Sequence, residues 1–143
     1  MENDTVKLLR ECNAGIKMGI DTIESVLERV ENRSFYAVLK TCKDEHIKLE
    51  TETGVLLQEL GEEGKEPNPI AKGMSFVKTN VKTVVEPGDS TIADLVTDGC
   101  HMGVKSLNRY LNQYATAEQR VKKIARKLIQ IEENLAEDIA QYL

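Results

Sequence analysis

The sequence predicts a single all-α domain built as a four-helix bundle, and two observations carry that prediction. Apolar residues recur at alternating three- and four-residue steps in several long stretches, which is the spacing of one buried face on an α-helix. Short segments rich in polar residues, glycine and proline separate these stretches. A chain of 143 residues can bury a substantial core without a metal or a disulfide. We therefore expect one domain over residues 1–143.

The first two helices are expected to pair as an antiparallel hairpin. Asn3 or Asp4 can cap the first helix, and a polar turn at 31–34 separates it from the second, with Ser34 as the expected N-cap. The buried face of the first helix should be Val6, Leu9, Asn13, Ile16, Ile20, Ile23, Leu27 and Val30. That of the second should be Phe35, Leu39, Cys42, His46, Leu49, Thr53, Leu56 and Leu60. Gly61 follows as a left-handed C-cap.

A second hairpin and a long connection complete the expected layout. A helix from Ser90 to about Tyr114 precedes the last helix, which Thr116 and Gln119 begin as a capping box. Their buried positions should be Ile92, Val96, Gly103, Leu107, Tyr110, Val121, Ile124, Leu128, Ile131, Leu135, Ile139 and Tyr142. The crossover, residues 61–89, contains a weaker helix over 69–85 and can return the chain to the other end of the bundle. The expected topology is up-down, long crossover with a short helix, down-up.

Charge and composition restrict the partners. The net charge of -5 repels phosphate backbones and anionic lipid, so we expect no nucleic acid and no membrane as partner. The N-terminus has no signal-peptide pattern, and no run of eighteen apolar residues occurs. We expect a cytoplasmic protein whose three cysteines, Cys12, Cys42 and Cys100, are reduced. Glycines at four-residue spacing, among them Gly15 and Gly19, predict close helix packing and leave a homo-oligomer through helix faces open.

Two hairpins joined by a long connection after Leu60-Gly61 resemble the ferritin-like superfamily, particularly its small bacterial members of unknown function with a short crossover helix. Di-iron members carry Glu-x-x-His on the second and fourth bundle helices. Here Lys43 stands where a glutamate would precede His46, and Leu135 follows Glu132 where a histidine would stand. The resemblance therefore implies a ferritin-like bundle with degenerate di-iron motifs.

Several polar residues should lie at one height in such a bundle, near His46. Cys42 and His46 are four residues apart and share a helix face, a spacing that lets a thiolate and an imidazole reach one cation. The candidate metal ligands are His46, Cys42, Glu24, Glu132 and Cys100. Sulfur and nitrogen donors favour zinc or a soft transition metal, and the resemblance adds iron. Asp98 and His101 lie on a polar helix face and are expected at the surface.

The same residues have a structural interpretation. Free cysteines commonly pack as small apolar groups, and a buried His46 can be satisfied by one carboxylate, from Glu132 or Glu24. Two hypotheses therefore stay open. The first is a non-catalytic bundle acting as a structural or interaction module, which the continuous aliphatic faces favour. The second is a metal-binding or redox protein that keeps a reduced site in the core.

Overall fold

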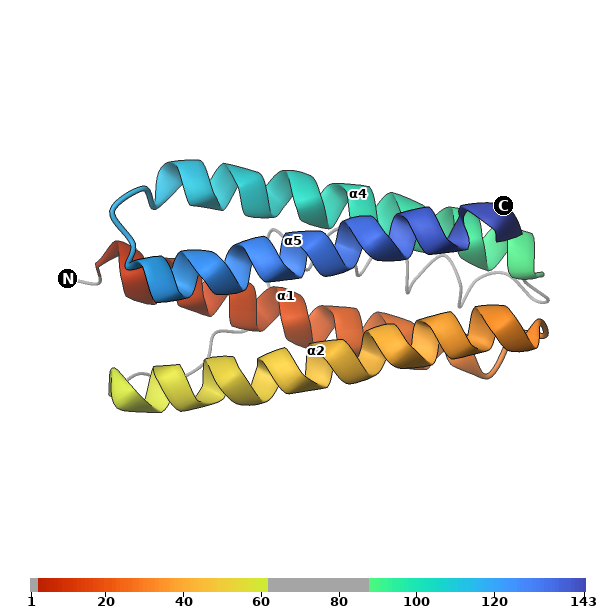
Figure 1. Cartoon of the computed structure of the whole chain (residues 1–143), viewed down its shortest axis with the longest axis horizontal. Helices are drawn as coiled ribbons and strands as arrows, with labels where there is room; N and C mark the ends of the chain where they lie inside the picture. Colours follow the sequence, from red (N-terminus) through yellow and green to blue (C-terminus); the bar gives the residue numbers. More distant parts are fainter. Residues whose placement is uncertain (1–2, 62–87) are drawn as a thin grey trace.

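Four long helices lie side by side in the computed structural model, which describes residues 3–61 and 88–143 (Figure 1). They are α1 (Asp4–Leu27), α2 (Arg33–Glu59), α4 (Asp89–Gln113) and α5 (Gln119–Ile139), followed by the short 3₁₀ helix η1 (Ala140–Tyr142). The predicted all-α four-helix bundle is confirmed for this part of the chain. The helix expected over 69–85, and with it the crossover, falls outside the described residues.

Hydrogen bonds at the two ends of the bundle fix the directions of the helices. At one end, the Asp89 carboxylate at the start of α4 accepts from the backbone N–H groups of Glu31 and Asn32, each at 2.9 Å. At the other end, the backbone N–H of Thr116, just before α5, donates to the carboxylate of Asp4 at 3.1 Å. Helices α1 and α5 therefore run in one direction, and α2 and α4 run in the opposite direction (Figure 1).

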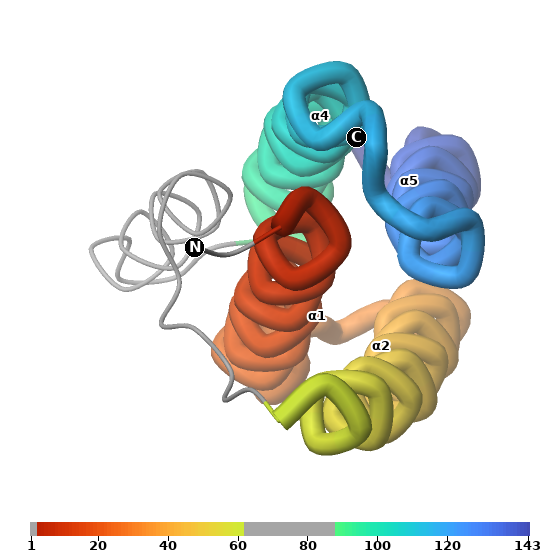
Figure 2. The backbone as a smooth tube through the Cα atoms, turned by 90° about the vertical axis from the view of Figure 1, so that its left-hand side faces the viewer, coloured from red at the N-terminus to blue at the C-terminus, as the bar shows by residue number. Residues whose placement is uncertain are grey.

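The end-on view gives the order of the helices around the bundle (Figure 2). Helix α1 lies next to α2 and α4, and α5 lies next to α4 and α2. Every one of these neighbours is antiparallel to the helix beside it, and α1 and α5 also touch across the middle. Side chains from all four helices consequently meet along one central axis.

The core follows the predicted periodicity closely. The predicted apolar positions that fall within α1, α4 and α5 are buried, whereas Val30 and Tyr142, at the ends of the predicted faces, lie beyond these helices and are only partly buried. On α2 the buried residue of the last turn is Leu57, and Leu56 is only partly buried. The ring of Phe35 at the start of α2 stacks on Tyr142 of η1 at a centroid distance of 4.6 Å, which closes that end of the bundle.

Two predicted helix caps are confirmed. The Asn3 side chain accepts a hydrogen bond from the Val6 N–H at 3.0 Å and begins α1. After α2, Gly61 adopts a φ of 70°, the left-handed conformation that favours glycine. Both positions were assigned from residue type and spacing alone.

Two other predicted caps are wrong. Asn32, not Ser34, caps α2, because its side-chain oxygen accepts from the N–H groups of Ser34 and Phe35. Helix α5 begins at Gln119 without a side-chain cap, so the predicted capping box does not form. Thr116 instead directs its hydroxyl to Asp4 of α1, a contact between distant segments that local sequence does not reveal.

The outer faces of the helices are charged. Lys40 and Asp44 pair at 3.2 Å on α2, and Arg120 reaches Glu59 at 3.4 Å, with all four side chains roughly half exposed. Exposed pairs of this kind contribute little to stability, so the core decides the fold. In the described part of the chain, no helix is long and apolar enough to cross a membrane.

Candidate functional site

The most unusual group in the core is His46, whose side chain is 1% exposed at the middle of α2. Its Nδ1 lies 2.8 Å from the carbonyl oxygen of Cys42, one turn earlier in the helix. Its Nε2 lies 3.0 Å from Oε1 of Glu132 on α5, which is also buried. The pair therefore joins the first hairpin to the second through the centre of the bundle.

These contacts determine where protons sit on the His46 ring. A carbonyl oxygen can only accept, so Nδ1 carries a proton and donates it to Cys42. The second nitrogen faces a carboxylate, which holds a further proton between Nε2 and Glu132. Burial by itself lowers the pKa of His46, but the hydrogen bonds to the Cys42 thiol and to the Glu132 carboxylate, and the charge of Glu132, outweigh it and raise the pKa. We interpret the pair as a buried imidazolium–carboxylate ion pair.

Gly19 on α1 provides the space for this ring. A Cβ atom at Gly19 would lie 2.7 Å from both Cδ2 and Nε2 of His46, which is closer than real Cβ contacts allow. The ring cannot move away easily because its two nitrogens are held on α2 and α5. The close packing predicted at this glycine is therefore packing against an imidazole. His46 thus connects α1, α2 and α5.

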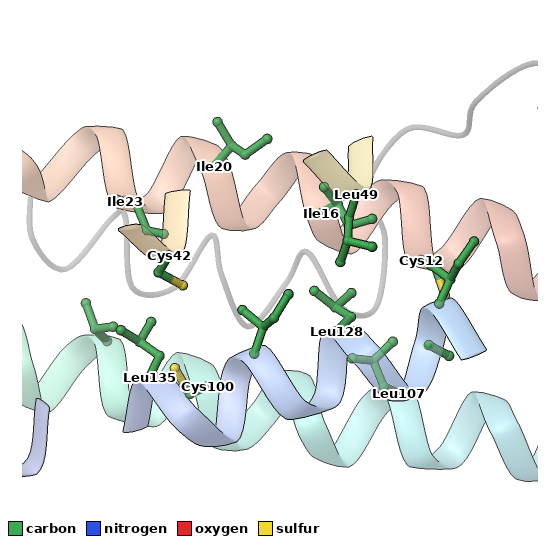
Figure 3. Close-up of a cluster of buried hydrophobic side chains, with 14 of the residues drawn as sticks. Cys12, Ile16, Ile20, Ile23, Cys42, Leu49, Cys100, Leu107, Leu128 and Leu135 are labelled. Atoms are coloured by element: carbon green, nitrogen blue, oxygen red, sulfur yellow. The ribbon is translucent and has the colours of Figure 1, made fainter. Parts of the chain in front are cut away.

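Two thiols flank the ion pair. The Sγ of Cys42 lies 3.6 Å from Nδ1 of His46. Figure 3 shows Cys42 on α2 and Cys100 on α4 with their sulfurs in the interior, near Leu135. Burial raises the pKa of Cys100, and its hydrogen bond with Glu132 and the charge of that carboxylate raise it further. Both thiols remain protonated at neutral pH, because burial also raises the pKa of Cys42.

A very small cavity borders the pair on the side of α4. Its volume is about 10 Å³, and Thr22, Cys100, His46 and Glu132 contribute to its wall. Such a space holds at most one water molecule. Among the described residues, no group of three or more His, Cys, Asp and Glu side chains is arranged to hold a metal ion.

Four of the five predicted site residues come together and one does not. His46, Cys42, Glu132 and Cys100 form the buried group, and the predicted partnership of His46 with Glu132 is confirmed. The placement of Glu24 in this group was wrong. Its side chain is 51% exposed and pairs with Lys43 at 3.2 Å, because a carboxylate at the edge of α1 remains solvated beside a lysine of α2. His101 is exposed, as predicted.

A second polar level lies nearer the other end of the bundle. The Thr53 hydroxyl of α2 lies 3.1 Å from Oδ1 of Asn13 on α1. Glu11 is 3% exposed, and burial together with the charge of this carboxylate raises the pKa of Tyr110 on α4. Sequence reasoning identified Asn13 and Thr53 on the apolar faces but missed Glu11, which falls outside the predicted face of α1.

The ion pair predicts a pH dependence of stability. The pKa of His46 in the folded chain is raised above its ordinary value of 6.5, so the folded state keeps a proton that the unfolded chain loses. The stabilisation is fully present below pH 6.5 and declines as pH rises toward the raised pKa. We expect the free energy of unfolding to fall by up to about 1.4 kcal/mol per pH unit above that point. Urea unfolding between pH 6 and pH 9 measures this slope.

The same experiment has an internal control. Above the ordinary thiol pKa of 9.0 the buried cysteines add a slope of the same sign, since burial raises the pKa of Cys12 to about 12. Below about pH 8 these thiols stay protonated in the unfolded chain as well, so between pH 6.5 and 8 the slope comes mainly from His46. A variant carrying both His46→Leu and Glu132→Leu should be flat in this range, whereas a flat profile for the unchanged protein would contradict the ion pair.

Comparisons with known proteins add no assignment to this geometry. No protein-family model matches the chain, and no curated protein or solved structure is significantly similar to it. A buried imidazolium whose two nitrogens face protein acceptors can hold helices in one arrangement, and it has no free lone pair to bind a ligand or abstract a proton.

Proposed function

We propose that the chain is a non-catalytic helical bundle of ferritin-like layout that serves as a structural or interaction module. The observation that carries this proposal is that both ring nitrogens of His46 already have protein partners. Its Nδ1 faces the Cys42 carbonyl, and its Nε2 faces Glu132. A catalytic or ligating imidazole needs one nitrogen available to a substrate or a cation. Here the ring joins two helices of the bundle.

The helix directions support the ferritin-like part of the proposal. Helix α2 ends at the end of the bundle where α1 begins, and α4 begins at the opposite end. This arrangement agrees with a long return connection between two hairpins, as in ferritin-like bundles. A non-catalytic descendant of such a bundle would have lost its inner carboxylates, and aliphatic side chains occupy most of the core of this chain.

One observation favours a metal-binding function as the second candidate. The Nδ1–H of His46 donates to a backbone carbonyl, which is the contact that commonly orients a metal-ligating histidine through its other nitrogen. Glu132 and the Cys100 thiol border the same cavity as Nε2. Zinc or iron could use these donors only after the ion pair opens and loses its proton.

Metal analysis separates the two candidates. We expect the purified protein to contain far less than one equivalent of zinc or iron, and its melting temperature to be unchanged by a chelator or by added Zn²⁺ or Fe²⁺. While His46 and Glu132 are paired with each other, neither can bind a metal ion, so added metal would not stabilise the folded state. Metal near one equivalent per chain, with a large drop in melting temperature on chelation, would contradict the proposal and select the metal-binding candidate.

A further inference from the structure

A groove on the outside of the bundle, between α2 and α5, is separate from the buried pair. Its volume is about 240 Å³, somewhat below the range of pockets that hold drug-sized ligands. Val38 and Cys42 of α2 and Ile131 and Leu135 of α5 contribute apolar surface to it. The groove is therefore suited to a small molecule with an aliphatic body.

Two carboxylates give the groove its charge. Glu45 of α2 and Asp138 of α5 line it, and both residues are exposed. Neither carboxylate forms a hydrogen bond or an ion pair within the part of the chain that the structure describes. Lysine and arginine do not contribute to the wall, so the groove attracts cations, as does the net charge of -5.

The helix register places the two carboxylates near opposite ends of the groove. Helices α2 and α5 are antiparallel, and their register is fixed by the His46–Glu132 contact at 3.0 Å and by the Phe35–Tyr142 stack. In this register Asp138 lies opposite residues 39–40 of α2, between five and six residues from Glu45. At a rise of 1.5 Å per residue, the two side chains start about 8 Å apart along the bundle.

We propose that this groove binds a short linear aliphatic diamine in its dicationic form. One ammonium group pairs with Glu45 and the other with Asp138, while the methylene chain lies along the apolar surface between them. The hydroxyl of Thr41 also lines the groove and can accept a hydrogen bond from an ammonium group. Oδ1 of Asn134, which accepts from Nε2 of Gln130 at 2.9 Å, has a second lone pair for the same purpose. The diamine site lies outside the buried His46–Glu132 pair on which the proposed function rests. A negative result for diamine binding would therefore leave the proposed function unaffected.

Isothermal titration with 1,5-diaminopentane at low ionic strength tests the proposal, since surface charge pairs are screened by salt. We expect saturable binding at one site per chain. Glu45→Gln and Asp138→Asn should each weaken it about three- to five-fold, the factor that corresponds to an exposed ion pair of up to about 1 kcal/mol. The monoamine 1-aminopentane has the same aliphatic chain and one charge, and it should bind more weakly by a similar factor.

Two matched variants distinguish this site from general attraction to an acidic protein. Glu52→Gln on α2 and Glu133→Gln on α5 remove the same charge from exposed positions that do not line the groove. Both should bind the diamine like the unchanged chain. The proposal is overturned if no saturable binding occurs, if 1-aminopentane binds as tightly as the diamine, or if these two variants weaken binding as much as Glu45→Gln.

Discussion

Replacing His46 by leucine is expected to destabilise the bundle by about 3–5 kcal/mol, the cost of leaving one buried partner of an ion pair without the other. The carboxylate of Glu132 would remain buried on α5 with its main partner removed. Glu132→Leu should cost a similar amount because it leaves the imidazolium alone. Chemical unfolding monitored by far-ultraviolet circular dichroism gives both values.

The double variant decides between an ion pair and two unrelated core residues. Joining His46→Leu with Glu132→Leu removes both charges and leaves two apolar groups of moderate size, so most of the stability should return. The coupling energy from this double-mutant cycle should therefore be several kcal/mol. His101→Leu is the matched control, since that histidine is exposed on α4 and its loss should change stability by no more than about 0.5 kcal/mol. If the stability loss of the double variant equalled the sum of the losses of the two single variants, the pairing of His46 with Glu132 would be contradicted.

Gly19→Ala is expected to destabilise the bundle by about 1–3 kcal/mol, although alanine is the better helix former. The added Cβ would lie 2.7 Å from two atoms of a ring that cannot swing away without breaking its bonds to Cys42 and Glu132. Thermal and urea unfolding of the purified variant measure the loss.

Gly54→Ala provides the matched control on α2. Apart from its chain neighbours and the backbone of its own helix turn, nothing lies within 4 Å of a Cβ built at this glycine, so the substitution should stabilise the protein by about 0.5–1 kcal/mol through helix propensity alone. Opposite signs for the two glycines are the expected result. If Gly19→Ala were as stabilising as Gly54→Ala, His46 could not occupy the position described.

The helices and their inward faces could be predicted from the sequence because apolar periodicity reports burial directly. The prediction reached His46 as well, since that residue continues the buried face of α2 between Cys42 and Leu49. It was less accurate at the end of the helix. The predicted face assumed alternating steps of three and four residues, an average of 3.5, whereas an α-helix has 3.6 residues per turn. The difference accumulates along α2, so Leu57 replaces Leu56 in the core.

The details of the site depend on side-chain reach, which spacing does not encode. Glu24 and Glu132 were both candidate partners of His46, and each follows a buried isoleucine of its helix, Ile23 or Ile131, so spacing alone does not separate them. Only the side chain of Glu132 reaches the ring. Glu24 finds Lys43 at the surface instead. Thr116 contacts Asp4 across more than a hundred residues of sequence, so its role could not come from local capping rules.

The central claim is that His46 is a protonated, fully partnered ring that joins α2 to α5 across the core. Nitrogen-15 NMR of the imidazole at pH 8 observes this state directly, because free histidine is neutral there. We expect both ring nitrogens of His46 to carry protons at pH 8. A His46 ring with one unprotonated nitrogen at pH 8, titrating near the ordinary value of 6.5, would contradict it.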